Sequence, residues 1–286
     1  MRVLVLGATG MLGHAVLRVF ADSPGYEVQG VARRAGAIHR LPAALQTRVQ
    51  AGLDVLETSL LATFLQRFRP QVVINAVGIV KQLTEAKDAV ACIELNALFP
   101  HRLAVLCEQV GSRLVQVSTD CVFTGIKGFY TEQDLPDPPD LYGRSKLLGE
   151  IDLPHVVTLR TSIIGHELDA ANSHSLIGWF LNQQGSATGF TRAVFSGLPT
   201  VELAHIIRDY VLPRPDLHGV YHVAAAPINK FDLLTLVAQA YGGAPELRPV
   251  DQPVIDRSLN PGRFQETTGY VAPPWPELVA RMARFR

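Results

Sequence analysis

The sequence predicts an α/β protein built on a doubly wound parallel sheet, with a smaller region towards the C-terminus. Short apolar runs alternate with helical patterns over the first 160 residues, as is typical of parallel strands buried on both faces. A glycine-rich turn follows the first run. The chain has 286 residues, 48% hydrophobic and 18% charged. That composition supports one large or two modest domains and excludes disorder as the main state.

The elements follow in order. We expect strands at residues 2–6, 27–31, 48–51, 72–75, 113–118 and 155–160. Helical patterns between them cover residues 11–20, 59–68, 86–110 and 142–151. The alternation predicts βαβ units and therefore a parallel sheet.

The second half is less regular. Helices are expected at 175–182, 201–211, 231–241 and 276–284, and a strand at 219–223. Proline and glycine cluster between 242 and 276, which predicts loops. We expect one region from residues 1–160 plus about 201–224, and a second from about 161–200 and 225–286.

Charge and cysteine content narrow the function classes. Lysine plus arginine and aspartate plus glutamate number 26 each, which argues against broad electrostatic binding to nucleic acid or an acidic membrane. Cys92, Cys107 and Cys121 are too few and too scattered for a disulfide framework, so we expect a reduced, cytoplasmic protein. No apolar run approaches membrane-spanning length. The nine histidines show no metal-binding spacing, and no metal is expected.

The first turn carries the pattern G-x-x-G-x-x-G at Gly7, Gly10 and Gly13. Glycines let a dinucleotide pyrophosphate approach the start of the following helix, whose dipole favours an anion. Placed between a strand and a helix, the pattern predicts a Rossmann-like cofactor site. The first region of the chain would hold the dinucleotide and the second the substrate.

The end of the second strand indicates which dinucleotide binds. An acidic residue there would select a ribose 2′-hydroxyl, but the strand runs into Arg33 and Arg34. Paired guanidinium groups suit a 2′-phosphate, so NADP(H) is favoured over a merely solvated basic loop. Asp54 could accept from the adenine amino group, and the small residues at 76–78 could let the ribose pass; a cap or a packing role is almost as plausible for each.

A tyrosine and a lysine four residues apart form the candidate catalytic pair. Tyr142 and Lys146 would share a helix face, and a lysine ammonium there would lower the phenol pKa and hold a nicotinamide ribose. Thr119, at the end of the preceding strand, supplies a hydroxyl for the same carbonyl.

On these motifs the sequence resembles the extended short-chain dehydrogenases/reductases, and within them the dTDP-4-dehydrorhamnose reductase branch. The resemblance rests on GATGMLG near the N-terminus and VSTDCVFTG and YGRSKLLGE in the middle, and continues through LRTS, GLPTVELA and GVYHVA. It implies catalysis by Thr119, Tyr142 and Lys146, NADP(H) as cofactor and a nucleotide-sugar substrate, and it leaves a homodimer open. The predicted cofactor-binding residues are Gly7, Thr9, Gly10, Met11, Leu12, Gly13, Arg33, Arg34, Asp54, Ala76, Val77, Gly78, Asn96, Tyr142 and Lys146.

The sequence departs from that branch at two positions. Cys121 stands where those reductases commonly have tyrosine, and Ile163 where they tend to have an aromatic residue. These departures put the sugar more in doubt than the reaction type. The predicted substrate-binding residues are Asp120, Phe123, Arg192 and Arg257, the two arginines because a diphosphate needs guanidinium partners.

Four functions fit these motifs. An NADPH-dependent 4-keto reductase is favoured. A sugar-nucleotide epimerase would usually retain NAD, against Arg33 and Arg34. A dehydratase would need a second acidic residue where Cys121 stands. A non-catalytic NADP-binding regulatory subunit would often lack part of the catalytic set, which is complete here.

Overall fold

A computed structural model describes residues 1–81, 84–169, 174–242 and 245–286. Its centre is a seven-stranded parallel sheet with the order β11-β6-β5-β4-β1-β2-β3. The strands are β1 (Arg2–Leu6), β2 (Glu27–Ala32), β3 (Val49–Ala51), β4 (Val72–Asn75), β5 (Arg113–Thr119), β6 (Val156–Thr161) and β11 (Gly219–His222). The strand order reverses between β1 and β4, and ligands of such sheets bind at this switch point, beyond the strands' carboxyl ends. The predicted fold class is confirmed.

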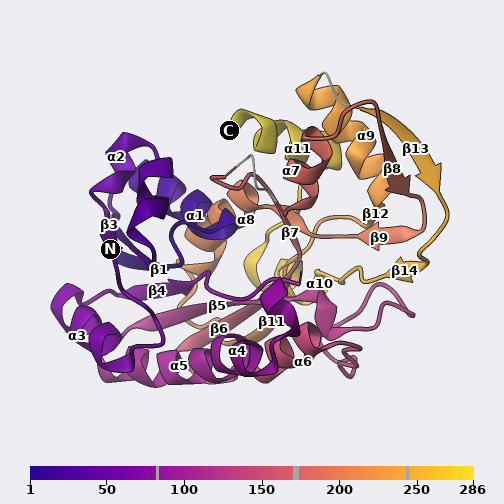
Figure 1. Cartoon of the computed structure of the whole chain (residues 1–286). Coiled ribbons are helices and arrows are strands. Elements are labelled where there is room, and N and C mark those ends of the chain that lie inside the picture. Colours follow the sequence, from indigo (N-terminus) through magenta and orange to yellow (C-terminus); the bar gives the residue numbers. More distant parts are fainter. Residues whose placement is uncertain (82–83, 170–173, 243–244) are drawn as a thin grey trace.

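Helices cover both faces of this sheet (Figure 1). Alternate residues of β1 point to opposite faces: Val3 and Val5 join a core with α1 (Met11–Ala21) and α8 (Thr200–Ile206). Leu4 and Leu6 join the core beneath α3 (Thr58–Phe68) and α5 (Phe99–Gln109). The near-continuous burial of each strand follows from this two-sided cover.

The predicted helix at 86–110 is present as a continuous helical segment, Ala89–Gln109, with a wider π-turn inside it. It consists of α4 (Ala89–Cys92), η3 (Ile93–Leu98) and α5. By length and composition alone this segment could cross a membrane, against the expectation that no run approaches that length. Half of its most apolar window, of mean hydropathy 1.4, is buried inside the protein, and a core helix passes the same test.

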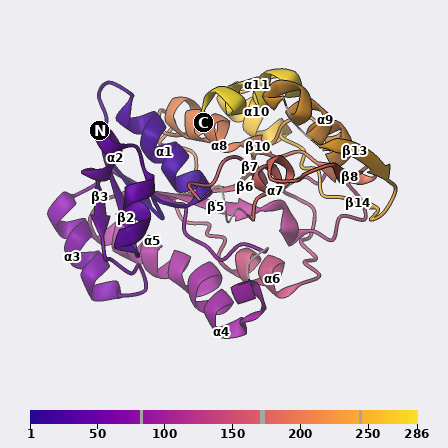
Figure 2. The same cartoon turned by 45° about the horizontal axis from the view of Figure 1, so that its top comes forward.

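The later elements form three small sheets beside the large one, gathered with α9 and α11 on the side away from α3 (Figures 1 and 2). Their strands are β7 (Ile163–Ile164), β8 (Ser186–Phe190), β9 (Ala193–Phe195), β10 (Leu198–Pro199), β12 (Ile228–Asn229), β13 (Glu246–Val250) and β14 (Ile255–Asp256). The helices are α7 (Leu176–Leu181), η6 (Ile207–Val211), α9 (Lys230–Tyr241), α10 (Gly262–Thr268) and α11 (Trp275–Arg284). Strands β13 and β14 and helix α10 lie within the segment predicted as loops, which corrects that prediction.

The remaining short elements connect successive strands of the large sheet. They are η1 (Ala35–Arg40), α2 (Ala43–Gln46), η2 (Thr84–Lys87), η4 (Asp120–Val122) and α6 (Leu141–Leu148). Helix α6 ends three residues before its predicted end. A Cβ on Gly149 would lie 2.0 Å from the Asn96 carbonyl oxygen, so only glycine permits this close approach, and the chain turns there.

Candidate functional site

The predicted glycine turn joins β1 to α1 at the switch point of the sheet. Gly7 has φ 77°, and a Cβ there would lie 3.0 Å from the Ala76 carbonyl oxygen. A Cβ on Gly13 would lie 2.0 Å from the Gly7 carbonyl oxygen. Helix α1 starts after Gly10 with no side-chain cap and no acidic residue in its first turn. Its amino terminus is therefore suited to an anion.

A cavity of about 150 Å³ adjoins this turn. Thr9, Gly10 and Met11 line one side, while Arg40 and Asp169, joined by a 2.9 Å ion pair, line the other. Backbone N–H groups and a helix amino terminus are donors suited to a pyrophosphate, and Arg40 would add a guanidinium if it left Asp169; the Glu167 carboxylate also lines the cavity. Leu12 was also predicted to bind the cofactor. Its side chain is buried in the core, so only its backbone is available to the turn.

The two arginines predicted to select the cofactor follow β2 and are both exposed. Arg33 Nη1 lies 4.0 Å from Asp54 Oδ2, and Asp54 also accepts a hydrogen bond from the Leu56 N–H at 3.0 Å. The structure thus brings Arg33 and Asp54 together beside the ends of β2 and β3.

The small residues after β4 reach helix α6, which carries Tyr142 and Lys146. A Cβ on Gly78 would lie 3.1 Å from Asn96 Oδ1 and 3.9 Å from Lys146 Nζ. Ala76 and Val77, half-buried, lead to it from the strand. The buried Asn96 amide accepts from the Ile79 N–H at 2.9 Å and donates to the Ile79 carbonyl oxygen at 3.2 Å. Asn96 therefore braces the loop that the cofactor would pass, a more specific position than the sequence indicated.

Strand β5 ends in the predicted catalytic threonine. Thr119 Oγ1 accepts from the Cys121 N–H at 3.1 Å and donates to Asp120 Oδ1 at 3.2 Å. Burial raises the pKa of Asp120, and Arg257 opposes that shift. Burial and Asp120 raise the pKa of the Cys121 thiol to about 12, so the thiol is not a nucleophile at neutral pH.

Helix α6 presents the tyrosine and lysine to that strand end. Asp140 caps the helix by accepting from the Gly143 N–H at 2.8 Å. A Cβ on Gly143 would lie 2.3 Å from the Cys121 carbonyl oxygen, so glycine lets the first turn pack directly on η4. As a result the Tyr142 hydroxyl lies close enough to Thr119 for the threonine side chain to lower the Tyr142 pKa, against the larger effect of burial.

The electrostatics of this pair differ from the expectation. Burial raises the pKa of Tyr142, and the neighbouring Cys121 and Asp120 add to the effect. Lys146 was predicted to lower the pKa of Tyr142, but it is not among the groups that shift that pKa. The Lys146 ammonium donates instead to the Val117 carbonyl oxygen at 2.7 Å. Burial lowers the pKa of Lys146 to about 8, and the Glu150 carboxylate opposes that shift.

The predicted substrate residues occupy different environments. Phe123 is fully buried and stacked on Tyr130, with ring centroids 4.1 Å apart, so its side chain packs in the core and is not open to a ligand. Arg257 Nε donates to the Phe123 carbonyl oxygen at 2.8 Å. Arg192 is exposed and precedes β9, whereas Arg257 follows β14. Because β9 and β14 pair in parallel, the two arginines lie at opposite ends of that pair.

Sequence reasoning missed several charged neighbours of this site. Lys81 forms a 2.6 Å ion pair with the helix cap Asp140. Lys230, at the start of α9, has its pKa lowered by burial and feels the charge of Asp120. Glu150 lies behind Lys146. Only the motif YGRSKLLGE, which ends in Glu150, offered a signal; the two lysines come from distant parts of the chain.

Known proteins are similar to this chain over most of its length. The chain is 28% identical over 252 residues to methionine adenosyltransferase 2 subunit beta of Danio rerio, covering 84% of this chain and 74% of that protein. It is 27% identical over 240 residues to a dTDP-4-dehydrorhamnose reductase of Aggregatibacter actinomycetemcomitans, covering 79% and 74% respectively.

Solved structures show the same fold. A hypothetical dTDP-4-dehydrorhamnose reductase from Sulfolobus tokodaii matches with a TM-score of 0.76 and 26% identity, covering 96% of this chain and 98% of that one. A dTDP-4-dehydrorhamnose reductase from Bacillus anthracis in complex with NADP matches with a TM-score of 0.80 at 20% identity, covering 98% of each. The predicted relationship to NAD(P)-dependent sugar-nucleotide enzymes is thereby confirmed. Because the family described as RmlD substrate binding domain matches residues 1–283, nearly the whole sequence, the chain belongs to that family.

Proposed function

We propose that the protein is an NADPH-dependent reductase of a 4-keto group on a nucleotide-linked deoxysugar. One observation carries the proposal: the Tyr142 hydroxyl lies close enough to Thr119 to be influenced by its side chain, while Lys146 lies beside the Gly78 loop at the sheet's switch point. A proton donor, a second hydroxyl and a cation are thus gathered where a dinucleotide would end.

These residues divide the work on the carbonyl. NADPH, when bound, supplies the hydride. The Tyr142 hydroxyl donates the proton to the carbonyl oxygen, and its raised pKa keeps it protonated until then. Thr119 Oγ1 holds the same oxygen. The Lys146 ammonium, 3.9 Å from a Cβ position on Gly78, is placed to bind the ribose. Its second proposed role, stabilising the tyrosinate that remains, requires it to turn from the Val117 carbonyl oxygen towards Tyr142.

The cofactor assignment is supported by the shape and the charge of its site. Glycine is required at Gly7 and Gly13, which leaves the backbone bare where a pyrophosphate would lie. Arg33 and Arg34 are exposed beyond β2, where a 2′-phosphate would lie. Cys92, Cys107 and Cys121 form no disulfide in the described part of the chain, and we place the protein in the reducing cytoplasm as part of the same proposal.

A second candidate is a non-catalytic regulatory subunit that binds NADP(H). The relatives named methionine adenosyltransferase 2 subunit beta favour it, because they are 25–28% identical to this chain over alignments that cover most of its length. A regulatory protein on this fold would keep the glycine turn and would not need Tyr142.

The test is a panel of dTDP-, UDP- and GDP-linked 4-keto sugars, with NADPH consumption followed by absorbance. The wild type should oxidise NADPH in proportion to alcohol formed, and Tyr142→Phe should be slower by about 10² or more while still binding NADPH. Tyr210→Phe on η6, remote in sequence from the site, is the matched control and should turn over as the wild type does.

Each alternative has its own outcome. Conversion of a sugar without net NADPH consumption would indicate an epimerase. Tight NADPH binding without turnover of any sugar on the panel would favour the regulatory subunit. Equal turnover by Tyr142→Phe and the wild type would refute the catalytic assignment.

A further inference from the structure

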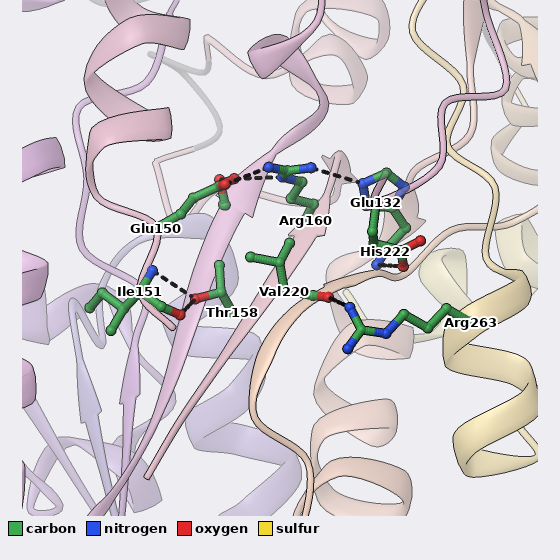
Figure 3. A network of polar contacts seen from close by, with 9 residues as sticks. Glu132, Glu150, Ile151, Thr158, Arg160, Val220, His222 and Arg263 are labelled. Atoms are coloured by element: carbon green, nitrogen blue, oxygen red, sulfur yellow. Dashed lines mark hydrogen bonds and ion pairs between the residues drawn. The ribbon is translucent and has the colours of Figure 1, made fainter. Parts of the chain in front are cut away.

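A buried polar network lies behind the candidate catalytic helix, and Figure 3 shows its members. Glu150 follows the end of α6. Its Oε1 accepts hydrogen bonds from Ser118 Oγ and Arg160 Nε, both at 2.7 Å, and its Oε2 accepts from Arg160 Nη2 at 2.6 Å. The Glu150 and Arg160 side chains are only 8% and 6% exposed. The carboxylate is therefore held by three donors, out of solvent, in one orientation.

Arg160 is held from its other side as well. Its Nη1 lies 3.3 Å from His222 Nε2, and His222 Nδ1 lies 3.0 Å from the Tyr130 carbonyl oxygen (Figure 3 draws the Arg160 contacts). Burial and the Arg160 charge lower the pKa of His222 to about 3, so the ring is neutral. A neutral ring that accepts from Arg160 must donate from Nδ1 to Tyr130. Both ends of the guanidinium are thereby fixed.

This network ends beside Lys146. The Lys146 ammonium donates to the Val117 carbonyl oxygen at 2.7 Å, and Glu150 accepts from Ser118, the next residue of β5. The lysine and the carboxylate are thus anchored on consecutive residues of one strand. Thr158 Oγ1 bonds both the N–H and the carbonyl oxygen of Ile151 at 3.3 and 3.1 Å, which fixes the chain directly after Glu150.

Other charged groups on the elements packed against α6 act elsewhere. Asp120 and Cys121 on η4 act on Tyr142, Asp140 at the helix start pairs with Lys81, and Asp88 caps α4. Glu94 on η3 and Lys87 on η2 are exposed. Within the described part of the chain, Glu150 is the carboxylate that opposes the effect of burial on Lys146.

We propose that Glu150 is a positioning residue for Lys146: locked by Ser118 and Arg160, its carboxylate keeps the buried lysine charged and pointed at the cofactor side of the strand end. The inference rests on the proposed function only in taking Lys146 as the catalytic cation. We assign Glu150 no contact with substrate or cofactor, because its buried carboxylate is already bound by Ser118 and Arg160.

The test titrates Lys146 directly. The chain has five lysines, so NMR of protein carrying [¹³Cε]lysine gives few signals, and Lys146→Arg identifies the one of interest. We expect a wild-type midpoint near the pKa of about 8. In Glu150→Gln the midpoint should fall by about one pH unit, because a nearby opposite charge is lost.

Two further variants separate this effect from damage to the fold. Glu150→Gln leaves Arg160 buried without its counter-ion, which can cost about 3–5 kcal/mol; Glu150→Gln combined with Arg160→Met removes that charge and should show the lowered midpoint in a folded protein. Glu202→Gln is the matched control. Its buried carboxylate also binds an arginine, Arg281, at 2.6 Å, so it should lose stability while leaving the Lys146 midpoint unchanged.

An unchanged midpoint in the folded double variant, or an equal fall in Glu202→Gln, would overturn the proposal. Turnover tests the functional consequence. At pH 8, Glu150→Gln should be about fivefold slower than the wild type, because a one-unit fall in the Lys146 pKa lowers the charged fraction of the lysine tenfold at most. Near pH 6 the lysine is charged in both proteins, so their rates should converge. A shifted midpoint with an unshifted rate profile would also refute it. The titration needs no substrate, so a wild type that reduces no sugar on the panel refutes the proposed function and leaves this result to stand by itself.

Discussion

Replacing Gly13 by alanine should weaken both the fold and NADPH binding, although the position lies inside a helix. By helix propensity alone the change would stabilise α1 by about 1 kcal/mol. The added Cβ, however, would lie 2.0 Å from the Gly7 carbonyl oxygen, whereas carbon contacts are comfortable only beyond about 3.5 Å. The turn and the helix must separate by about 1 Å or more.

The magnitude follows from these two opposing effects. The obstructing atom is backbone and cannot rotate away, so the cost is at the upper end for overpacking, about 3 kcal/mol. The net loss is then about 2 kcal/mol, or about 4 °C in Tm for a chain of this size. Because Gly7 moves with the turn, NADPH affinity should fall at least about tenfold, equivalent to about 1.4 kcal/mol.

Thermal unfolding and calorimetric titration with NADPH measure the two effects. Gly36→Ala is the control, since a Cβ there meets nothing within 4 Å, and it should match the wild type in both assays. A Gly13→Ala protein with wild-type Tm and NADPH affinity would refute the steric reasoning.

Three further predictions concern the charged groups of the site. The wild type should bind NADPH at least about tenfold more tightly than NADH. Arg33→Ala combined with Arg34→Ala should abolish this preference and leave the affinity for NADH little changed. Equal wild-type affinities for NADPH and NADH by calorimetry would contradict the assignment. Lys146→Ala should lower both turnover and NADPH affinity, because Lys146 is assigned to the tyrosinate and to the ribose. Loss of turnover with unchanged NADPH affinity would contradict the proposal that Lys146 binds the ribose. Since the pKa of His222 lies near 3 in the fold against 6.5 unfolded, its contribution to stability is present above about pH 6.5 and is lost as pH falls towards 3. The wild type should therefore lose about 2 kcal/mol more than His222→Gln between pH 7 and 5. Urea unfolding at both pH values checks this, and equal losses would contradict it.

The sequence by itself determined the parts of this protein that depend on local pattern. The strands β1 and β4 were predicted with their observed bounds. Each is a short apolar run, which is the pattern expected of a strand whose two faces are both covered by helices. The glycine spacing marked the switch-point turn, and the pair Tyr142 and Lys146 was found from a spacing that one helix face imposes. The division into two regions, the roles of the site residues and a homodimer stay predictions.

Tertiary structure decided what depends on residues far apart in the chain. Strands β8 and β13 are 60 residues apart, and neither has a strong periodicity of its own, so their pairing could not be read locally. Phe123 follows strand β5 closely in sequence, yet Tyr130 and His222 pack against its ring. Glu150 opposes the lowering of the Lys146 pKa by burial, and Glu150 is itself held by Arg160, which comes from strand β6. Spacing can indicate which side chains share a helix face, but burial and the partners of a charge are set only when distant strands come together, because desolvation and Coulomb energy depend on position in space.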